Sequence, residues 1–204
     1  RESLIFVTLI WLSCGLASAI PIMTIEAITF TDAVFEAFSG LTTTGSTVLS
    51  HLDQQPKSFL LYRQFLQWLG GLGVVIFVVA ILPMLNIGGM KILKAETPGP
   101  VKGEKITPRV MLTARYLWYV YIVLTVLCTL GYLATGMSWF DSIAHSLSTV
   151  STGGFSTHDA SIGYFNSRWV ELNANIFMVL GAINFGLHFR FGLGFNPKIY
   201  KKDE

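Results

Sequence analysis

Charged side chains are scarce in this sequence, and the scarcity is concentrated in a few long runs. Only 13% of the 204 residues are Asp, Glu, Lys or Arg, against about 25% in a typical soluble domain. Residues 3–25, 64–90, 116–140 and 172–189 contain none of these four types. A helix needs about 20 mainly apolar residues to cross a membrane. The first three runs reach this length, so the sequence argues against a soluble domain and predicts an all-α integral membrane protein.

The fourth run, residues 172–189, is more polar than the others because it carries three asparagines and His188. A polar helix of this kind usually faces the interior of a bundle or a water-filled path. A secretory signal is the alternative for the first run. However, apolar residues continue through positions 21–23 and three further runs follow, which favours a spanning helix.

Cysteine and catalytic signatures are also scarce. Cys14 and Cys128 both lie in apolar runs, which argues against a disulfide framework. The sequence has no Gly-x-Ser-x-Gly or His-Glu-x-x-His motif. The enzyme alternative is an intramembrane hydrolase, which would have to use Ser39, Ser46, His51, His145, Ser146 or His188. A nucleophile needs an activating base within reach. We interpret His145 and His188 as packed or interfacial and predict that the chain is not an enzyme.

Basic residues are unevenly placed along the chain. They gather in the connection 91–109 and after the fourth run, at Lys91, Lys94, Lys102, Lys105 and Arg109, and at Arg190, Lys198, Lys201 and Lys202. Basic residues in short loops mark the cytoplasmic side of a membrane protein. We therefore predict a cytoplasmic linker at 91–109 and cytoplasmic ends for the chain. Nucleic-acid binding, another use of basic tracts, is not expected beside a membrane.

Two segments between the runs are too short and too polar to cross a membrane. Residues 29–50 and 138–157 each begin with about ten helix-compatible residues and then become rich in Thr, Ser and Gly. Ten helical residues extend for about 15 Å, half the thickness of the hydrocarbon core. Each segment is therefore predicted to enter the membrane as a short helix and to return as a loop.

The two segments match each other without a gap when Asp32 is aligned with Asp141. Thr29-x-x-Asp32 and Ser138-x-x-Asp141 both have the form that caps the start of a helix. The matching side chains have similar chemistry at ten positions, and the flanking apolar runs recur in the same order. The chain is therefore predicted to contain two tandem copies of span, re-entrant segment and span.

The loop of each segment carries the groups that a dehydrated cation needs. Backbone carbonyls and hydroxyl oxygens can replace the water shell of an ion, as in potassium-channel filters. Glycine permits conformations that aim successive carbonyls in one direction, and the end of a short helix adds partial negative charge. The predicted cation-coordinating residues are Thr42, Thr43, Thr44, Gly45 and Ser46 in the first segment, and Ser151, Thr152, Gly153, Gly154 and Phe155 in the second.

At these residues the sequence resembles the TrkH/TrkG/KtrB superfamily of potassium transporters. The motifs are Ala37-Phe38-Ser39-Gly40-Leu41-Thr42-Thr43-Thr44-Gly45-Ser46-Thr47 and Ser148-Thr149-Val150-Ser151-Thr152-Gly153-Gly154-Phe155-Ser156. The stretch Gln67-Trp68-Leu69-Gly70-Gly71-Leu72-Gly73 is similar to the start of this family's first inner helix. The resemblance covers essentially the whole chain.

The resemblance implies four potassium-channel-like repeats around one pore, each with an outer helix, a pore helix, a filter loop and an inner helix. It implies K⁺ as the transported ion, no catalytic cofactor, and a homodimer in the inner (plasma) membrane of a bacterium. It also implies a cytoplasmic nucleotide-binding regulatory ring of the TrkA type. The central filter glycines would be Gly45 and Gly154, followed by Ser46 and Phe155 where a strict potassium channel has tyrosine and a second glycine.

Two of the four expected repeats are present. We expect a first repeat at 1–90, the linker at 91–109, a second repeat at 110–195, and a tail or connector at 196–204. We expect a fragment of a longer polypeptide whose other two repeats complete the pore, rather than two such halves that assemble. A structural membrane subunit without conduction is the remaining alternative.

Several residues near the second apolar run are assigned to structure rather than to transport. Gly70, Gly71 and Gly73 suit close helix packing. Arg63 and Arg168 each precede a predicted inner helix, and we expect both at the outer membrane interface.

Overall fold

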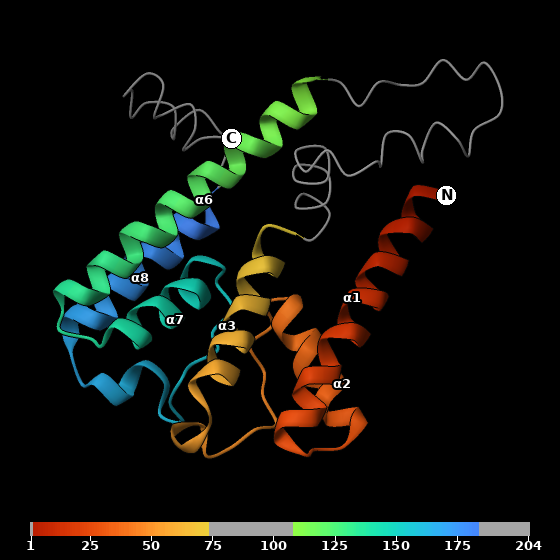
Figure 1. Ribbon diagram of the computed structural model, residues 1–204. Coiled ribbons are helices and arrows are strands. Elements are labelled where there is room, and N and C mark those ends of the chain that lie inside the picture. Colours follow the sequence, from red (N-terminus) through yellow and green to blue (C-terminus); the bar gives the residue numbers. More distant parts are fainter. Residues whose placement is uncertain (1, 74–107, 184–204) are drawn as a thin grey trace.

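The computed structural model describes residues 2–73 and 108–183, and in these ranges it contains helices joined by loops and no strand (Figure 1). The prediction of an all-α fold is confirmed for this part of the chain. The predicted linker at 91–109 and the tail at 196–204 lie essentially outside the described residues, as do His188 and most of the second apolar run.

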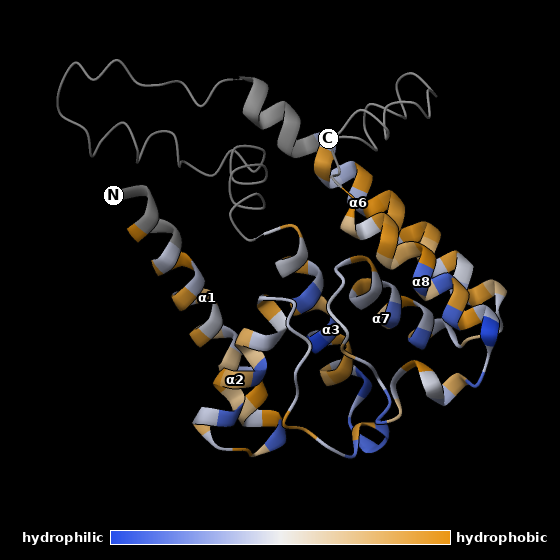
Figure 2. Cartoon of the chain, turned by 180° about the vertical axis from the view of Figure 1, so that it is seen from behind, coloured by the Kyte–Doolittle hydropathy of each residue, from blue (hydrophilic) through white to orange (hydrophobic). Residues whose placement is uncertain are grey.

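Two long apolar helices, α1 (Glu2–Glu26) and α6 (Pro108–Ala134), flank the shorter helices (Figure 1). Within them, Thr8–Glu26 and Tyr116–Ala134 are long and apolar enough to cross a membrane. Many of their large apolar side chains are exposed, among them Ile20 and Val123. Figure 2 shows that the coloured part of α6 is mostly hydrophobic. Such a surface is unfavourable in water but is expected of a helix that faces lipid.

The two short helices begin at the predicted caps. α2 (Phe30–Leu41) and α7 (Trp139–Val150) have 12 residues each. Thr29 Oγ1 accepts a hydrogen bond from the backbone N–H of Asp32 at 3.2 Å, and Ser138 Oγ accepts one from the N–H of Asp141 at 3.1 Å. Each hydroxyl also donates to the carboxylate of the same Asp at 2.8 Å. We call residues 2–73 the first half and residues 108–183 the second half. The predicted capping and helix length are therefore confirmed in both halves.

Within the described residues, a 3₁₀ turn and then a third helix follow each short helix and its loop. The first half continues through η1 (Leu52–Gln54) to α3 (Lys57–Gly71), and the second continues through η2 (Ser161–Phe165) to α8 (Arg168–Ala182). Helix α3 begins at Lys57, so the prediction that residues 67–73 start this helix is wrong.

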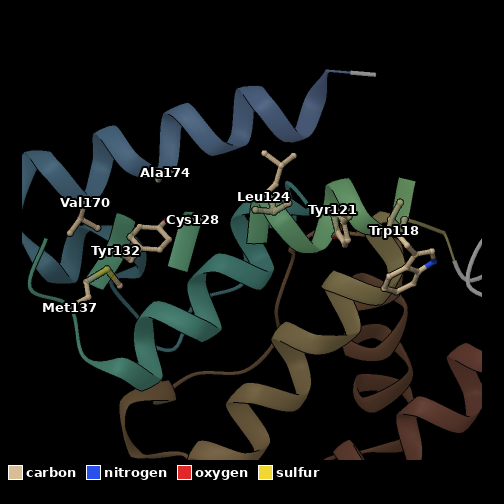
Figure 3. Close-up of a cluster of buried hydrophobic side chains, with 10 residues drawn as sticks. Trp118, Tyr121, Leu124, Cys128, Tyr132, Met137, Val170 and Ala174 are labelled. Atoms are coloured by element: carbon tan, nitrogen blue, oxygen red, sulfur yellow. The ribbon is translucent and has the colours of Figure 1, made fainter. Parts of the chain in front are cut away.

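The described residues contain two clusters of buried apolar side chains. The first joins α1, α2 and α3 and includes Ile22, Ala33 and Phe59. The second joins α6 to α7 and α8, with Tyr132 and Val170 among its members (Figure 3). It also includes residues from the end of α3, so the second cluster extends across the boundary between the halves.

The two halves meet mainly where α3 packs against α7. Helix α3 also bonds to α6, where the indole N–H of Trp68 donates to Thr125 Oγ1 at 3.0 Å and the Tyr121 hydroxyl donates to the Trp68 carbonyl at 3.0 Å. Arg63 also lies in this region. The prediction that it occupies the outer interface is wrong, because its side chain is 1% exposed within α3, whereas Arg168 at the start of α8 is exposed.

Candidate functional site

The two polar loops that follow α2 and α7 share a pattern of left-handed residues. We call residues 42–47 the first polar loop and residues 151–156 the second polar loop. The second and fourth residues of each loop have left-handed φ angles: Thr43 (+54°), Gly45 (+77°), Thr152 (+53°) and Gly154 (+90°). Only glycine adopts such angles readily, and alternation of left-handed and ordinary residues turns successive carbonyls in a similar direction.

Backbone hydrogen bonds hold the start of each loop against its own short helix. The N–H of Thr44 donates to the Ser39 carbonyl at 2.9 Å, and the N–H of Gly153 donates to the Ser148 carbonyl at 2.8 Å. These pairs correspond in the same alignment that places Asp32 on Asp141 in the sequence. The internal repeat therefore extends to individual backbone hydrogen bonds.

The predicted cation-coordinating residues differ in exposure. Those exposed in this chain are Thr42, Thr44, Ser46, Thr152 and Gly154, those half-buried are Thr43 and Gly45, and those buried are Ser151, Gly153 and Phe155. The Phe155 ring lies against the Arg63 guanidinium, with 4.2 Å from Cζ to the ring centroid. The Phe155 side chain is thus used in packing, so this residue could offer a cation only its backbone oxygen, whereas Thr152 is exposed and carries a hydroxyl oxygen as well.

The first and second polar loops touch each other although they are far apart in the sequence. A Cβ atom placed on Gly45 would lie 2.0 Å from the carbonyl oxygen of Gly153. That approach is possible only because Gly45 has no side chain. A Cβ on Gly154 would meet nothing within 4 Å. The fold therefore brings the two predicted glycine-centred loops side by side. The backbone of the second polar loop contacts the glycine of the first.

Matching residues of α2 and α7 anchor the far end of each loop. Glu36 Oε1 accepts hydrogen bonds from the Thr47 hydroxyl and from the N–H of Val48 at 2.7 Å. At the equivalent places in the second half, His145 Nε2 and Ser156 Oγ lie 2.9 Å apart. A buried Ser–His pair could suggest a hydrolase. Its counterpart, however, is a Glu–Thr pair, so we assign both pairs to loop anchoring.

Side chains of helix α3 contact both polar loops. Arg63 Nη2 pairs with Glu36 Oε2 at 3.2 Å and donates to Thr47 Oγ1 at 2.9 Å. Gln67 Oε1 accepts hydrogen bonds from Ser148 Oγ at 2.8 Å and from the N–H of Phe155 at 3.1 Å. Sequence reasoning missed Glu36 and Gln67 and misplaced Arg63.

Glycines let the third helix of each half approach the end of the short helix. A Cβ on Gly70 would lie 1.9 Å from the Leu41 carbonyl oxygen, and one on Gly181 would lie 2.4 Å from the Val150 carbonyl oxygen. A Cβ on Gly71 would likewise meet the Tyr121 hydroxyl at 2.5 Å. The assignment of Gly70 and Gly71 to packing is confirmed. Gly73 instead has a left-handed φ of +74° in open space.

The loops that follow the two polar loops are joined by a polar contact. His158 Nδ1 bonds to the carboxylate of Asp53, and Asp53 Oδ2 also accepts from the N–H of Asp159 at 3.3 Å. The Leu52 N–H donates to Asp159 Oδ1 at 3.1 Å. The hydrogen bond from His158 holds the pKa of Asp53 below its ordinary value of 3.8. These bonds tie the first half to the second through the loops that follow the two polar loops.

Comparison with known proteins identifies the family of the chain. The chain matches the family model of TrkH, described as a cation transport protein, over residues 1–203. The chain belongs to the TrkH family. The crystal structure of the potassium transporter TrkH from Vibrio parahaemolyticus matches with a TM-score of 0.80 at 46% identity, covering 100% of this chain and 41% of that one.

Members of the TrkH family are also among its curated relatives. The Trk system potassium uptake protein TrkH of Halomonas elongata is 53% identical over 191 residues, which are 93% of this chain and 40% of the relative. TrkG of Escherichia coli is 47% identical over 189 residues, which are 92% of this chain and 39% of the relative. The chain thus spans well under half the length of these relatives, and the resemblance predicted from the sequence is confirmed.

Proposed function

We propose that this chain forms half of a pore that conducts potassium, and that the carbonyls of the two polar loops supply half of its filter. The observation that carries the proposal is the pair of adjacent loops with matching left-handed residues at Thr43 and Thr152 and at Gly45 and Gly154. Relatives in the TrkH family are named potassium uptake proteins. Among the described residues no group of three or more His, Cys, Asp or Glu could hold a metal ion, which accords with coordination by backbone oxygens.

The remaining expectations from the family resemblance form part of this proposal. The pore would be completed by two further repeats of the same subunit, and the subunits would pair as homodimers. The complex would lie in the inner membrane of a bacterium with the ends of this chain in the cytoplasm, where a nucleotide-binding ring would regulate it. The transported ion would be K⁺. Helices α1 and α6 both start at the same end of the molecule (Figure 1), which supports a tandem repeat.

The test is rubidium uptake into vesicles that contain the full-length parent, with sodium as the competing ion. We would compare Gly45→Ala and Gly154→Ala with Gly136→Ala. Gly136 is a matched control because its φ is +91°, close to the +90° of Gly154, and a Cβ at either position would meet nothing within 4 Å. Gly154→Ala and Gly136→Ala each strain a left-handed residue by about 1 kcal/mol, but only Gly154 lies in a polar loop, so these two variants form the matched pair. Gly45→Ala adds to the same strain a Cβ 2.0 Å from the Gly153 carbonyl oxygen, which forces the two polar loops apart.

We expect Gly45→Ala and Gly154→Ala to lose at least about tenfold in the preference for rubidium over sodium, because filter carbonyls would turn away from the ion. Gly136→Ala should keep the wild-type preference. Unchanged preference in both loop variants, with normal folding by size-exclusion chromatography, would leave a structural membrane subunit as the better interpretation.

A further inference from the structure

We propose that Gln67 and Arg63 on α3 are positioning residues that fix the two polar loops relative to each other. This inference rests on the proposed function, because it assigns to α3 the task of setting the filter geometry. The two side chains lie about one helical turn apart and so project from the same face of α3. Together they contact both loops.

Gln67 fixes the second polar loop directly. Its side-chain oxygen accepts from the N–H of Phe155 at 3.1 Å and from Ser148 Oγ at 2.8 Å. The acceptor must be the oxygen, since a backbone N–H can only donate. A Cβ on Gly153 would lie 2.4 Å from the Gln67 amide. The amide therefore packs against the backbone of the second polar loop, and it links that loop to the end of α7.

Arg63 connects the first polar loop to the second. Its guanidinium pairs with Glu36 and donates to Thr47 in the first half, while it also lies over the Phe155 ring of the second half. Arg63 and Gln67 are 1% and 0% exposed. A buried guanidinium that is both hydrogen-bonded and stacked has little freedom to move. The distance between the two loops is thus set by one rigid helix.

The second half lacks this pair of residues. Helices α3 and α8 correspond when their first residues, Lys57 and Arg168, are aligned, and this alignment also places Gly70 on Gly181. In the same alignment Arg63 falls on Ala174 and Gln67 on Met178. Neither replacement can accept or donate a comparable hydrogen bond. Arg63 and Gln67 are therefore specific to the junction between the first and second halves rather than a general feature of the repeat.

The experiment measures competition between rubidium and sodium in vesicles that contain the full-length parent. Gln67→Met removes both hydrogen bonds at similar volume, and Gln67→Glu restores an acceptor oxygen. Ser148→Ala removes one of the two bonds with little change in packing. Trp68→Phe is the control, because it deletes the bond from the adjacent residue of α3 to Thr125, away from both loops, and keeps an aromatic ring beside Trp118 and Tyr121.

We expect Gln67→Met to lower the preference for rubidium over sodium by about tenfold, because a buried N–H without a partner favours other loop conformations. Ser148→Ala should lower it by about threefold, and Gln67→Glu should stay within about threefold of wild type. Trp68→Phe should match wild type. Should Gln67→Met fail to fold, the smaller loss in Ser148→Ala still decides the question.

Two results would overturn the inference in distinguishable ways. Wild-type preference in Gln67→Met or Ser148→Ala, while Gly45→Ala loses it, would refute the role of Gln67 and leave the filter assignment intact. Wild-type preference in Gly45→Ala and Gly154→Ala as well would remove the proposed function itself. Equal loss in Gln67→Met and Trp68→Phe would show general destabilisation of α3 rather than positioning of the loops.

Discussion

The ion pair between Glu36 and Arg63 gives a quantitative prediction about stability. Both residues are 1% exposed, and Nη2 lies 3.2 Å from Oε2. Removal of one partner from a buried pair leaves an uncompensated charge and typically costs about 3–5 kcal/mol. The carboxylate also accepts from Thr47 and Val48, so Glu36→Ala removes the anchor of the first polar loop in addition to the charge partner of Arg63.

We expect Glu36→Ala in the full-length parent to lower the thermal unfolding midpoint by about 6–10 °C, at about 2 °C per kcal/mol for a large chain. The assay is thermal unfolding in detergent followed by intrinsic tryptophan fluorescence. The double variant Glu36→Ala with Arg63→Met should be less damaging than the sum of the single variants, because it leaves no unpaired charge. Additive losses, or a fall below about 2 °C in Glu36→Ala, would refute a buried ion pair.

Three further predictions concern contacts on either side of the two polar loops. Thr29→Ala and Ser138→Ala should each cost about 1 kcal/mol in thermal unfolding, because each removes the cap of a short helix. Gly70→Ala and Gly181→Ala should each cost about 1–3 kcal/mol, since the added Cβ would overlap a carbonyl oxygen. Asp53→Asn should lower the unfolding midpoint at pH 5. The difference from wild type should shrink as the pH falls below 3.8, because the contact that lowers the pKa of Asp53 stabilises the folded protein only while the carboxylate is ionised.

Matched controls separate these effects from general damage. Gly163→Ala should be neutral, because a Cβ there meets nothing within 4 Å and its φ lies outside the left-handed range. Unequal losses in the two cap variants would contradict the repeat, since their hydrogen bonds are nearly identical. A constant Asp53→Asn difference from pH 5 to pH 3 would show that the carboxylate does not stabilise the contact through its charge.

The sequence was sufficient to predict what depends on neighbours along the chain. The caps at Thr29 and Ser138, the half-length helices and the matching loops all follow from residues within one short segment of each half. The membrane class followed from composition alone, and the family from three short motifs. The assignment of the loops to a filter, the bounds of the repeats and the orientation in the membrane stay predictions.

Contacts that join distant residues were beyond sequence reasoning. Nothing local distinguishes Arg63 from an interfacial arginine, because its partner Glu36 lies 27 residues away. Gln67 meets partners 81 and 88 residues along the chain. The register between the halves also shifts along the chain, because the alignment of the short helices would place Lys57 on Asn166 rather than on Arg168. An ungapped comparison therefore hides the correspondence of the third helices.

The contacts of α3 imply an order of assembly during synthesis. Arg63 finds Glu36 within the first half, so that pair can close as soon as α3 has left the ribosome. Gln67 must wait for Phe155, which follows 88 residues later. At about 5–20 residues per second, roughly 4–18 s pass before the amide of Gln67 meets its backbone partner. During that interval Gln67 in the first half lacks its hydrogen-bond partners in the second half. Synthesis of α7 and the second polar loop supplies these partners and completes the hydrogen bonding of α3.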